Sequence, residues 1–395
     1  MQDSADVVVI GAGVIGASVA FHLAALGAGR VRVFERGRIG EGTSAQSSGI
    51  LRTHYSVPSN VELALRSWRV YERFADELGD AEASAGLVRC GYLIAAPPGD
   101  KAEALRRSLA DQRARGIAVL ELDAQAAAER LPIARFDGDA LIGYEPDAGF
   151  GDATLVATGY ARAARRRGVR VDEGLAVQGL LRQGERIVGV RTAQGEVHAG
   201  VVVSVQNIWA AELQTWAGLR LPLHAERHRV LALQGPEPYT RAMPVFKDLA
   251  CAGMLYARSY GGAQMLVSEG TAGEVLDHPD TTPGAIDMDW VLELGAQVAA
   301  RFPSFSEAGL ASSWTGVYDV TPDWNPILGA VPGLDGLVLA CGFSGHGFKL
   351  APALGRVLAQ TALGLPTDVD LTPYALQRFA GGRLLSGRYG QGAVS

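Results

Sequence analysis

Three glycines near the start of the chain have the spacing of a dinucleotide-binding turn. Gly11, Gly13 and Gly16 form a G-x-G-x-x-G motif after an apolar run, and Glu35 ends the next apolar run. In such a motif the first glycine makes the turn, the second lets the backbone approach a pyrophosphate, and the third lets helix pack on strand. The phosphates lie at the helix N-terminus, and the acidic residue accepts hydrogen bonds from a ribose. The pattern predicts a site for NAD or FAD.

A second glycine-rich turn near the other end of the chain favours FAD over NAD. Gly342, Gly345 and Gly347 follow an apolar run and open a long apolar segment of helical character. Backbone N–H groups at such a turn would face a hydrogen-bond acceptor, for example the pyrimidine edge of a flavin. A nicotinamide-dependent dehydrogenase needs no second turn of this kind, so FAD is the preferred cofactor.

Two cations stand at the ends of glycine-rich stretches. Arg52 closes the stretch 42–52, Lys349 closes the stretch 341–349, and both have apolar neighbours. A buried cation is costly unless an anion pairs with it, so an anionic ligand is a natural partner for both residues. The alternative is that each pairs with an acid of the protein, such as Asp323.

The elements that must position these residues follow from the apolar pattern. Residues 5–10 and 31–34 are short apolar runs of the kind found in buried parallel strands, and residues 14–26 between them have helical spacing. An amphipathic helix is predicted over residues 60–78, with Asn60 as its N-cap. The start of the chain is therefore a strand–helix–strand unit followed by a further helix.

Buried strands are also expected near residues 200 and 340, and strands of this type should share one sheet with the first. The strand-rich segments between them then form a second domain that is inserted twice. The predicted division assigns residues 1–85, 145–215 and 325–395 to a discontinuous FAD-binding domain, and residues 86–144 and 216–324 to a substrate-binding domain.

The composition limits the class of protein. The 395 residues carry a formal net charge of −6 with a pI near 5.7, which argues against nucleic acid or an anionic membrane as a partner. Cys90, Cys251 and Cys341 lie far apart, without the spacing of a disulfide framework or a metal site. No apolar stretch approaches the roughly 18 to 20 residues that span a bilayer, and the acidic start lacks the basic region of a secretory signal. We expect a soluble, cytoplasmic protein without a metal.

Several stretches resemble a known group of flavoenzymes. They are GTSAQSSGILR at 42–52, TPDWNPILG at 321–329 and CGFSGHGFK at 341–349, with further likeness over 143–152 and 201–213. The chain resembles the FAD-dependent amino-acid oxidoreductases of the glycine oxidase, sarcosine oxidase and D-amino-acid oxidase type, and most of all the sarcosine oxidase-like branch. The resemblance is weak only from about 215 to 310. It implies an α/β fold: a glutathione-reductase-type, Rossmann-like FAD-binding domain with an inserted α+β antiparallel-sheet substrate domain.

The resemblance also implies positions for the cofactor. The loop past the flavin matches Ser44, Ser47, Ser48 and Gly49, the backbone that holds the adenine matches Val177, and the loop along the pyrimidine ring matches Gly342, Gly345, His346, Gly347, Phe348 and Lys349. Relatives that bind flavin covalently have a cysteine where this chain has Gly316. FAD is therefore expected to be bound without a covalent link.

Roles near the substrate follow from the same resemblance. In sarcosine oxidase-like members an arginine at the position of Arg52 and a lysine at the position of Lys349 hold the substrate carboxylate over the flavin. Tyr256, Tyr260 and Tyr318 are candidates for lining the amine pocket, and any of them could instead be a core aromatic residue with a satisfied hydroxyl. His346 is not assigned a catalytic role, because a buried imidazole is more often satisfied by the protein itself.

Two positions depart from the pattern of the family. The lysine beside the flavin at which oxygen reacts is replaced here by Gln264 or Met265. A cation there stabilises superoxide as it forms, so its absence puts oxidase activity in doubt. Asn207 stands at a usual glycine, and asparagine tolerates the positive φ of that turn.

These inferences together predict oxidation of the C–N bond of a small amino acid or N-alkyl amino acid. A hydride would move to flavin N5, the imine would hydrolyse, and O2 or another acceptor would reoxidise the flavin. The expected partner is a small anionic, amino-acid-like substrate. Two alternatives stay open: a flavin dehydrogenase that passes electrons to a quinone, a carrier or a partner subunit, and an idle FAD-binding subunit. Arg52 and Lys349 count against an idle site.

Overall fold

The first three elements form the strand–helix–strand unit that the glycine motif predicts. The computed structural model describes residues 3–239, 241–280, 286–385 and 387. β1 (Asp3–Ile10), α1 (Val14–Ala25) and β2 (Val31–Glu35) lie close to the predicted bounds, and β1 pairs with β2 in parallel.

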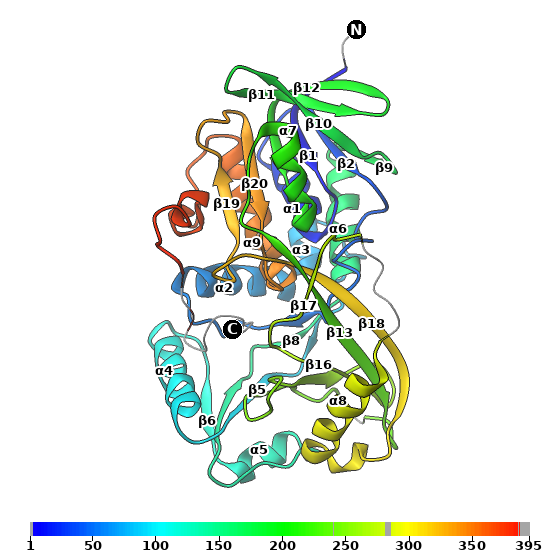
Figure 1. The fold of residues 1–395 in the computed structure, drawn as a ribbon, viewed down its shortest axis with the longest axis vertical. Coiled ribbons are helices and arrows are strands. Elements are labelled where there is room, and N and C mark those ends of the chain that lie inside the picture. The colour runs from blue at the N-terminus through cyan, green and yellow to red at the C-terminus, as the bar shows by residue number, and fades with distance from the viewer. Residues whose placement is uncertain (1–2, 240, 281–285, 386, 388–395) are drawn as a thin grey trace.

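The upper lobe in Figure 1 is built on one sheet, which has eight strands within the described residues. The further strands are β9 (Arg170–Glu173), β10 (Val177–Gln183), β11 (Arg186–Thr192), β12 (Gly195–Ser204), β19 (Ile327–Ala330) and β20 (Leu337–Cys341). The strand order is β10-β11-β12-β1-β2-β9, and β20 pairs with the second half of β12 and with β19. β1, β2, β9, β12 and β20 are parallel, so the prediction that strands near 5, 200 and 340 share one sheet is confirmed.

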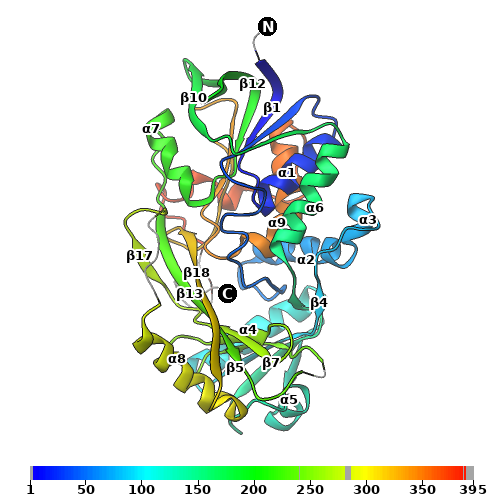
Figure 2. The same cartoon turned by 90° about the vertical axis from the view of Figure 1, so that its right-hand side faces the viewer.

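Helices cover both faces of this sheet (Figure 2). On one face α6 (Ala153–Arg166) and α9 (Gly347–Ala362) pack against α1, and α2 (Pro58–Glu72) packs against α9. The short helix α7 (Leu213–Ala217) lies on the other face. The apolar run at 201–205 can therefore be buried on both sides, as its composition requires.

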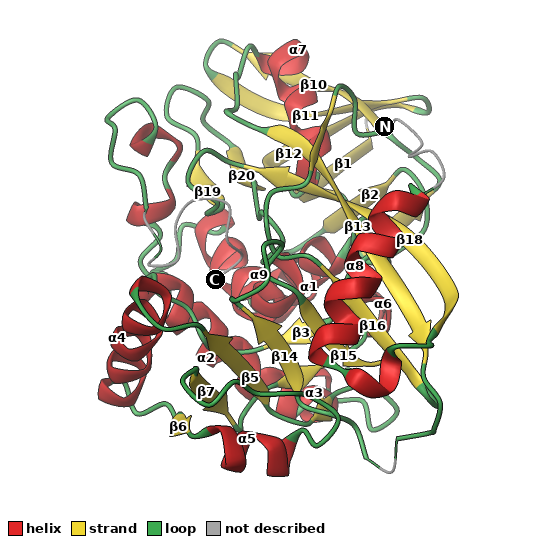
Figure 3. Ribbon diagram, turned by 60° about the horizontal axis from the view of Figure 1, so that its bottom comes forward, coloured by secondary structure: helices red, strands yellow, loops and turns green. Residues whose placement is uncertain are grey.

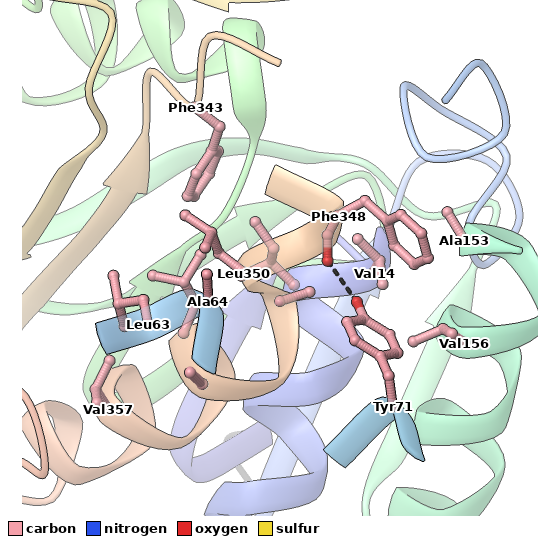
Figure 4. Packing of buried hydrophobic residues seen from close by; sticks show 14 of the residues in the cluster. Val14, Leu63, Ala64, Tyr71, Ala153, Val156, Phe343, Phe348, Leu350 and Val357 are labelled. Atoms are coloured by element: carbon pink, nitrogen blue, oxygen red, sulfur yellow. Dashed lines mark hydrogen bonds between the residues drawn. The ribbon is translucent and has the colours of Figure 1, made fainter. Parts of the chain in front are cut away.

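The larger apolar core joins α1, α2, α6 and α9. Figure 4 shows Tyr71 of α2, Val156 of α6 and Phe348 of α9 in this cluster. The Tyr71 hydroxyl donates a hydrogen bond to the Phe348 carbonyl, and the two rings meet edge to face. The first turn of α9 is thereby fixed to α2.

The helix predicted over 60–78 is divided in two. α2 begins before the predicted start, with proline in its first turn, and α3 (Phe74–Leu78) follows it. The side chain of Asn60 donates to Asn325 Oδ1 at 2.7 Å and accepts from the Tyr374 hydroxyl at 2.7 Å. The prediction that Asn60 is the N-cap is wrong, because buried polar partners from distant parts of the chain bind its amide.

The lower lobe contains a sheet of nine strands within the described residues. They are β5 (Tyr92–Ala96), β6 (Leu120–Leu122), β7 (Leu141–Glu145), β13 (His224–Gln234), β14 (Val245–Asp248), β15 (Tyr256–Ser259), β16 (Gln264–Ser268), β17 (Glu274–Leu276) and β18 (Gly309–Val320). The order is β17-β13-β16-β15-β14-β5-β7-β6, with β18 beside β13. All pairs are antiparallel except that of β5 and β14.

The two faces of the lower sheet have different neighbours. α5 (Ala124–Arg130) and α8 (Met288–Arg301) pack on one face, and Figure 3 shows α8 crossing the strands. α4 (Asp100–Ala114) lies against the other face, which shares its core with the upper lobe. A small sheet of β3 (Ile50–Leu51), β4 (Val88–Arg89) and β8 (Gly149–Phe150) connects the lobes. Among the described helices, none has the length and apolar character that a membrane span requires.

Candidate active site

Two glycines of the turn between β1 and α1, Gly11 and Gly16, have no room for a side chain. Gly11 has a φ of +99°, and a Cβ on it would lie 2.5 Å from the Val205 carbonyl oxygen. A Cβ on Gly16 would lie 2.0 Å from the Gly11 carbonyl oxygen, and one on Gly13 would lie 3.2 Å from Ser44 Oγ. The glycines therefore keep the backbone exposed at the N-terminus of α1, as a pyrophosphate site requires.

Glu35 lies at the end of β2 and supports this turn. Its carboxylate accepts hydrogen bonds from the Ala12 N–H at 2.7 Å and the Gly37 N–H at 2.8 Å. Each oxygen keeps a second lone pair for a ligand hydroxyl. Glu35 and Val177, the residues predicted to contact ribose and adenine, both line a cavity of about 730 Å³ that also borders Gly11.

The predicted flavin loop separates this cavity from a second one of about 110 Å³. Ser44 lines both cavities, and its Oγ accepts a hydrogen bond from the Val14 N–H of α1 at 3.0 Å. Ser47 and Ser48 line the second cavity, and Ser47 Oγ accepts from the Gly49 N–H at 3.1 Å. The two cavities therefore adjoin at the N-terminus of α1.

The second glycine-rich turn borders the other side of the second cavity. Gly345 has a φ of +82°, and a Cβ on it would lie 2.5 Å from the Tyr318 ring. The Gly342 N–H donates to Asp319 Oδ2 at 2.5 Å, and burial raises the pKa of Asp319 to about 7. α9 starts at Gly347, so the backbone of its first turn lies along the cavity. Of the residues predicted to run along the pyrimidine ring, Gly345, Gly347, Phe348 and Lys349 line this cavity, whereas Gly342 and His346 do not.

Arg52 lies within electrostatic reach of Lys349. Lys349 lines the second cavity, and its ammonium donates to the Gly345 carbonyl at 3.1 Å. Arg52 is buried, donates to the His54 carbonyl, and lies 4.7 Å from the centre of the Tyr55 ring. Burial, together with the charge of Arg52, lowers the pKa of Lys349. An anion bound here would relieve the repulsion between the two cations.

Asp323, the acid considered as an alternative partner for these two cations, is paired with another arginine. Asp323 accepts hydrogen bonds from Arg378 Nε at 2.7 Å and Arg378 Nη2 at 2.9 Å. The alternative pairing of Arg52 or Lys349 with Asp323 is therefore wrong. Arg378, which sequence analysis did not consider, takes that role because the C-terminal segment folds back onto the 321–329 stretch.

Glu145 is a buried carboxyl within electrostatic reach of Arg52, and it already accepts hydrogen bonds from the protein. It accepts from the Thr53 N–H at 2.7 Å, the Thr53 hydroxyl at 2.6 Å and the His54 N–H at 3.1 Å. Burial raises the pKa of Glu145 to about 7. Glu145 therefore fixes the backbone beside Arg52 and adds at most a partial negative charge at neutral pH.

The two histidines near the cations are neutral. Burial, then the charge of Lys349, lowers the pKa of His346 well below its usual value, and His346 Nδ1 lies 3.0 Å from the Tyr55 hydroxyl. Burial, then the charge of Arg52, lowers the pKa of His54 to about 3. Neither histidine adds to the positive charge of the site.

Lys247 is a third buried cation, and sequence analysis missed it. It lies on β14, pairs with Tyr256 of β15, and is 7% exposed. Burial, then the charge of Arg52, lowers the pKa of Lys247 to about 7. A signal was present, because only three of the 36 basic residues of the chain are lysines. Two of those three lie here.

The candidate tyrosines have different surroundings. Tyr318 lines the second cavity and stacks on His228, with ring centres 3.9 Å apart. Tyr256 is half-buried next to Lys247 in the sheet, and desolvation raises the pKa of both tyrosines. Both hydroxyls therefore stay protonated and can serve only as neutral hydrogen-bonding groups.

The positions that depart from the family pattern can now be placed. Gly316 lines the second cavity, so no thiol stands there to attach a flavin. Met265 is fully buried in the core beneath α8, on the face of β16 that turns away from the cavities. Gln264 donates to Gln234 Oε1 at 3.3 Å. Asn207 has a φ of +53°, so the prediction that asparagine preserves this turn is confirmed.

The groove fits the predicted cofactor. Two adjoining cavities run past two glycine-rich turns, two helix N-termini and an acceptor carboxylate. Glycines at 11 and 345 are required because a Cβ would meet protein atoms at 2.5 Å in both places. These groups are the donors and acceptors that a dinucleotide with a flavin needs.

The comparisons with known proteins agree with this geometry. The family model described as FAD dependent oxidoreductase (DAO) matches residues 6–361. The chain is 28% identical over 384 residues to 4-methylaminobutanoate oxidase (formaldehyde-forming) of Paenarthrobacter nicotinovorans, and this match covers 95% of the chain and 45% of that relative. It is 30% identical to glycine oxidase of Geobacillus kaustophilus, covering 95% and 97%. The structure of L-proline dehydrogenase from P. horikoshii superposes with a TM-score of 0.88 at 25% identity, covering 98% and 100%.

Proposed function

Because the chain belongs to the family of FAD dependent oxidoreductases, we propose that it oxidises the C–N bond of a small, anionic amino acid or N-alkyl amino acid. The observation that carries the proposal is the buried Lys349, which lines the cavity that the glycine-rich turns border, together with the buried Arg52, whose charge lies close enough to lower the pKa of Lys349. A carboxylate held there would place an amino acid against the cofactor. The names of the relatives, which specify 4-methylaminobutanoate, glycine and L-proline, support this substrate class.

The chain's own residues would bind and orient the cofactor. FAD, when bound, accepts the hydride from the carbon that carries the nitrogen. Glu35 and Val177 would hold the adenosine, and the turn at Gly13 would hold the pyrophosphate. The first turn of α9, at Gly347, would favour negative charge on the pyrimidine through its free N–H groups and its dipole.

The same residues would present the substrate. Arg52 and Lys349 would bind the carboxylate, while Tyr256 and Tyr318 would line the place of the amine. An amine that binds in the neutral form needs no strong general base. Orientation and exclusion of water would then be the main contributions of the protein.

The test is carboxylate binding to the oxidised holoenzyme. Arg52→Met and Lys349→Met should each weaken the Kd of a monocarboxylate by about 2 to 4 kcal/mol, because a desolvated charge pair is lost, with FAD content unchanged. Arg66→Met is the matched control, because Arg66 pairs with Glu62 at the surface of α2. If both site variants bind carboxylates as tightly as the parent, the proposal is wrong.

We propose that FAD is held without a covalent bond, since Gly316 lines the cavity where a tethering thiol would stand. Acid precipitation should then release all flavin to the supernatant. Flavin in the pellet would contradict this. We also propose a cytoplasmic location, in keeping with cysteines at 90, 251 and 341 that are all free thiols.

The electron acceptor is proposed to be O2 or another oxidant, and one observation favours a dehydrogenase. Met265 faces away from the cavities and Gln264 is uncharged, so neither offers a cation to stabilise superoxide. Unless Lys349 or another cation takes that role, stopped-flow reoxidation in air-saturated buffer should be slow, while a quinone or phenazine restores turnover. Rapid reoxidation by O2 would leave an oxidase as the better description.

A further inference from the structure

Arg52, Lys247 and Lys349 bring three cationic side chains into one buried region. They are 4%, 7% and 8% exposed, respectively. Lys349 comes from α9 of the upper lobe and Lys247 from β14 of the lower lobe, with Arg52 just after β3. The charges of Arg52 and Lys247 both lower the pKa of Lys349, so the three groups lie within electrostatic reach of one another.

Glu145 and Asp248, the two acids closest to Lys247 along these strands, already have other partners. Glu145 accepts three hydrogen bonds from residues 53 and 54, and burial raises its pKa to about 7. Asp248, next to Lys247 along β14, points to the opposite face of the sheet and pairs with Arg301 at 2.7 Å. One substrate carboxylate bound by Arg52 and Lys349 would therefore still leave Lys247 without an anion.

The position of Lys247 is built into the lower sheet. Its strand neighbours are Ile94 on β5 and Tyr256 on β15, and Glu145 on β7 lies on the same face. This face turns toward the upper lobe, whereas Phe246 points into the core beneath α8. The register thus directs the Lys247 side chain to the side of the sheet where Arg52 lies.

Gly270 makes room for the ammonium of Lys247. A Cβ on Gly270 would lie 2.2 Å from Lys247 Nζ, and the φ of Gly270 is not in the left-handed region. Glycine is therefore needed here for space and not for its backbone conformation. Among the described residues, no hydrogen bond or ion pair to this ammonium is present, although a buried, unpaired cation is costly.

We propose that Lys247 binds a second carboxylate of the substrate, so that the enzyme acts on a dianionic amino acid. This inference rests on the proposed function, in which Arg52 and Lys349 bind the first carboxylate. The second carboxylate is carried either by the substituent on the nitrogen or by the side chain of the amino acid. A compact ammonium suits one carboxylate oxygen, and lysine is rare in this chain, at three of 36 basic residues.

The first experiment measures binding with a matched pair of inert ligands. Methylthioacetate and thiodiacetate differ by one carboxylate, and each is titrated into oxidised holoenzyme while the flavin absorbance is followed. The parent should bind thiodiacetate at least about ten-fold more tightly than methylthioacetate. In Lys247→Met, thiodiacetate should bind no more than about three-fold more tightly than methylthioacetate. Lys101→Met is the control and should keep the parent ratio, since Lys101 donates to the Leu249 carbonyl outside the site.

A second experiment locates the second carboxylate. Anaerobic flavin reduction is compared for iminodiacetate against N-methylglycine, and for N-methylaspartate against N-methylalanine. A preference for the dianion in the first pair places the carboxylate on the nitrogen substituent, and a preference in the second pair places it on the side chain. Either result supports the proposal when Lys247→Met removes the preference.

The outcomes separate this inference from the proposed function. If monocarboxylates bind and reduce the flavin but the parent shows no preference for dianions, the role of Lys247 is wrong and the proposed function stands. If no member of any pair changes the flavin spectrum, both are wrong. Should Lys247→Met fail to fold, the ligand ratio of the parent alone decides. A ratio that Lys247→Met leaves unchanged also overturns the inference.

Discussion

At the scale of single residues, the region between the lobes is defined by buried charge. Arg52, Lys247 and Lys349 are each at least nine-tenths buried, and burial disfavours the charged form of every such group. Glu145 compensates only in part because its pKa is raised to about 7. Burying these charges lowers the free energy of unfolding, and the proposed anion would offset this cost when it binds.

Glu145→Gln should show how this carboxyl positions Arg52. The amide keeps the shape but presents N–H groups where the carboxylate accepts hydrogen bonds from Thr53 and His54. We expect a loss of about 1 to 3 kcal/mol in unfolding free energy and weaker carboxylate binding. Thermal melting and ligand titration measure both, and Glu103→Gln on the surface of α4 is the control. Parent-like values for both would contradict this role.

Lys247→Met should change the pH dependence of stability. The titratable groups within electrostatic reach of Lys247 include Arg52, Lys349, His54 and His346, with Tyr256 beside it and Glu145 on the same face of the sheet. Because its folded pKa is lowered from 10.5 to about 7, the parent carries the full cost of a buried charge below pH 7 and loses this cost as the pH rises further. The variant should therefore melt at a higher temperature than the parent at pH 6, with a gap that narrows toward pH 10. A gap independent of pH would contradict the burial of a charged lysine.

At the scale of elements, the sequence predicted helices and strands correctly wherever a short local motif determines them. The glycine motif predicted β1, α1 and β2, and the second glycine turn predicted the start of α9. Lys247 could not be placed in this way, because its direction depends on the pairing of β14 with β5 and β15. Asn60 was misread for a similar reason, since its partners Asn325 and Tyr374 are distant in sequence.

Gly345→Ala should weaken FAD binding, whereas Gly364→Ala, which imposes a similar backbone strain elsewhere, should not. Gly345 and Gly364 both have positive φ, but only a Cβ on Gly345 meets a neighbour, the Tyr318 ring at 2.5 Å. Each alanine carries the left-handed penalty of about 1 to 2 kcal/mol. Gly345→Ala should in addition raise the Kd of FAD in titrations of apoprotein, while Gly364→Ala should not. Equal FAD affinity in the two variants would contradict the placement of this turn along the flavin.

At the scale of the whole molecule, the two lobes share the site and the cofactor groove. We propose that the lobes correspond to the predicted domains, 1–85, 145–215 and 325–395 against 86–144 and 216–324. A contact near residue 280 joins them beside the larger cavity. Arg36 and the Trp209 indole both donate to Asp280, at 2.8 Å and 3.0 Å, and all three residues line the cavity.

Asp280→Asn should speed the release of FAD. The amide removes the charge that pairs with Arg36, and exposed pairs of this kind are worth about 0.2 to 1 kcal/mol, so the dissociation rate should rise by a factor of roughly 1.4 to 5. Glu274→Gln is the control, because Glu274 pairs with Arg227 and Arg229 away from this cavity. Flavin fluorescence after dilution gives both rates. Equal rates would show that the contact does not retain the cofactor.

The central claim is that this chain transfers a hydride from an amino acid to bound FAD, and anaerobic mixing tests it most directly. Oxidised holoenzyme is mixed with amino acids, N-alkyl amino acids and their dicarboxylic counterparts, and flavin absorbance is recorded. At least one anionic amine should bleach the flavin fully and yield one carbonyl product per flavin. The Lys349→Met variant should need a far higher concentration of that amine to be reduced at half its maximal rate. If none bleaches a flavin that dithionite reduces completely, the claim is contradicted.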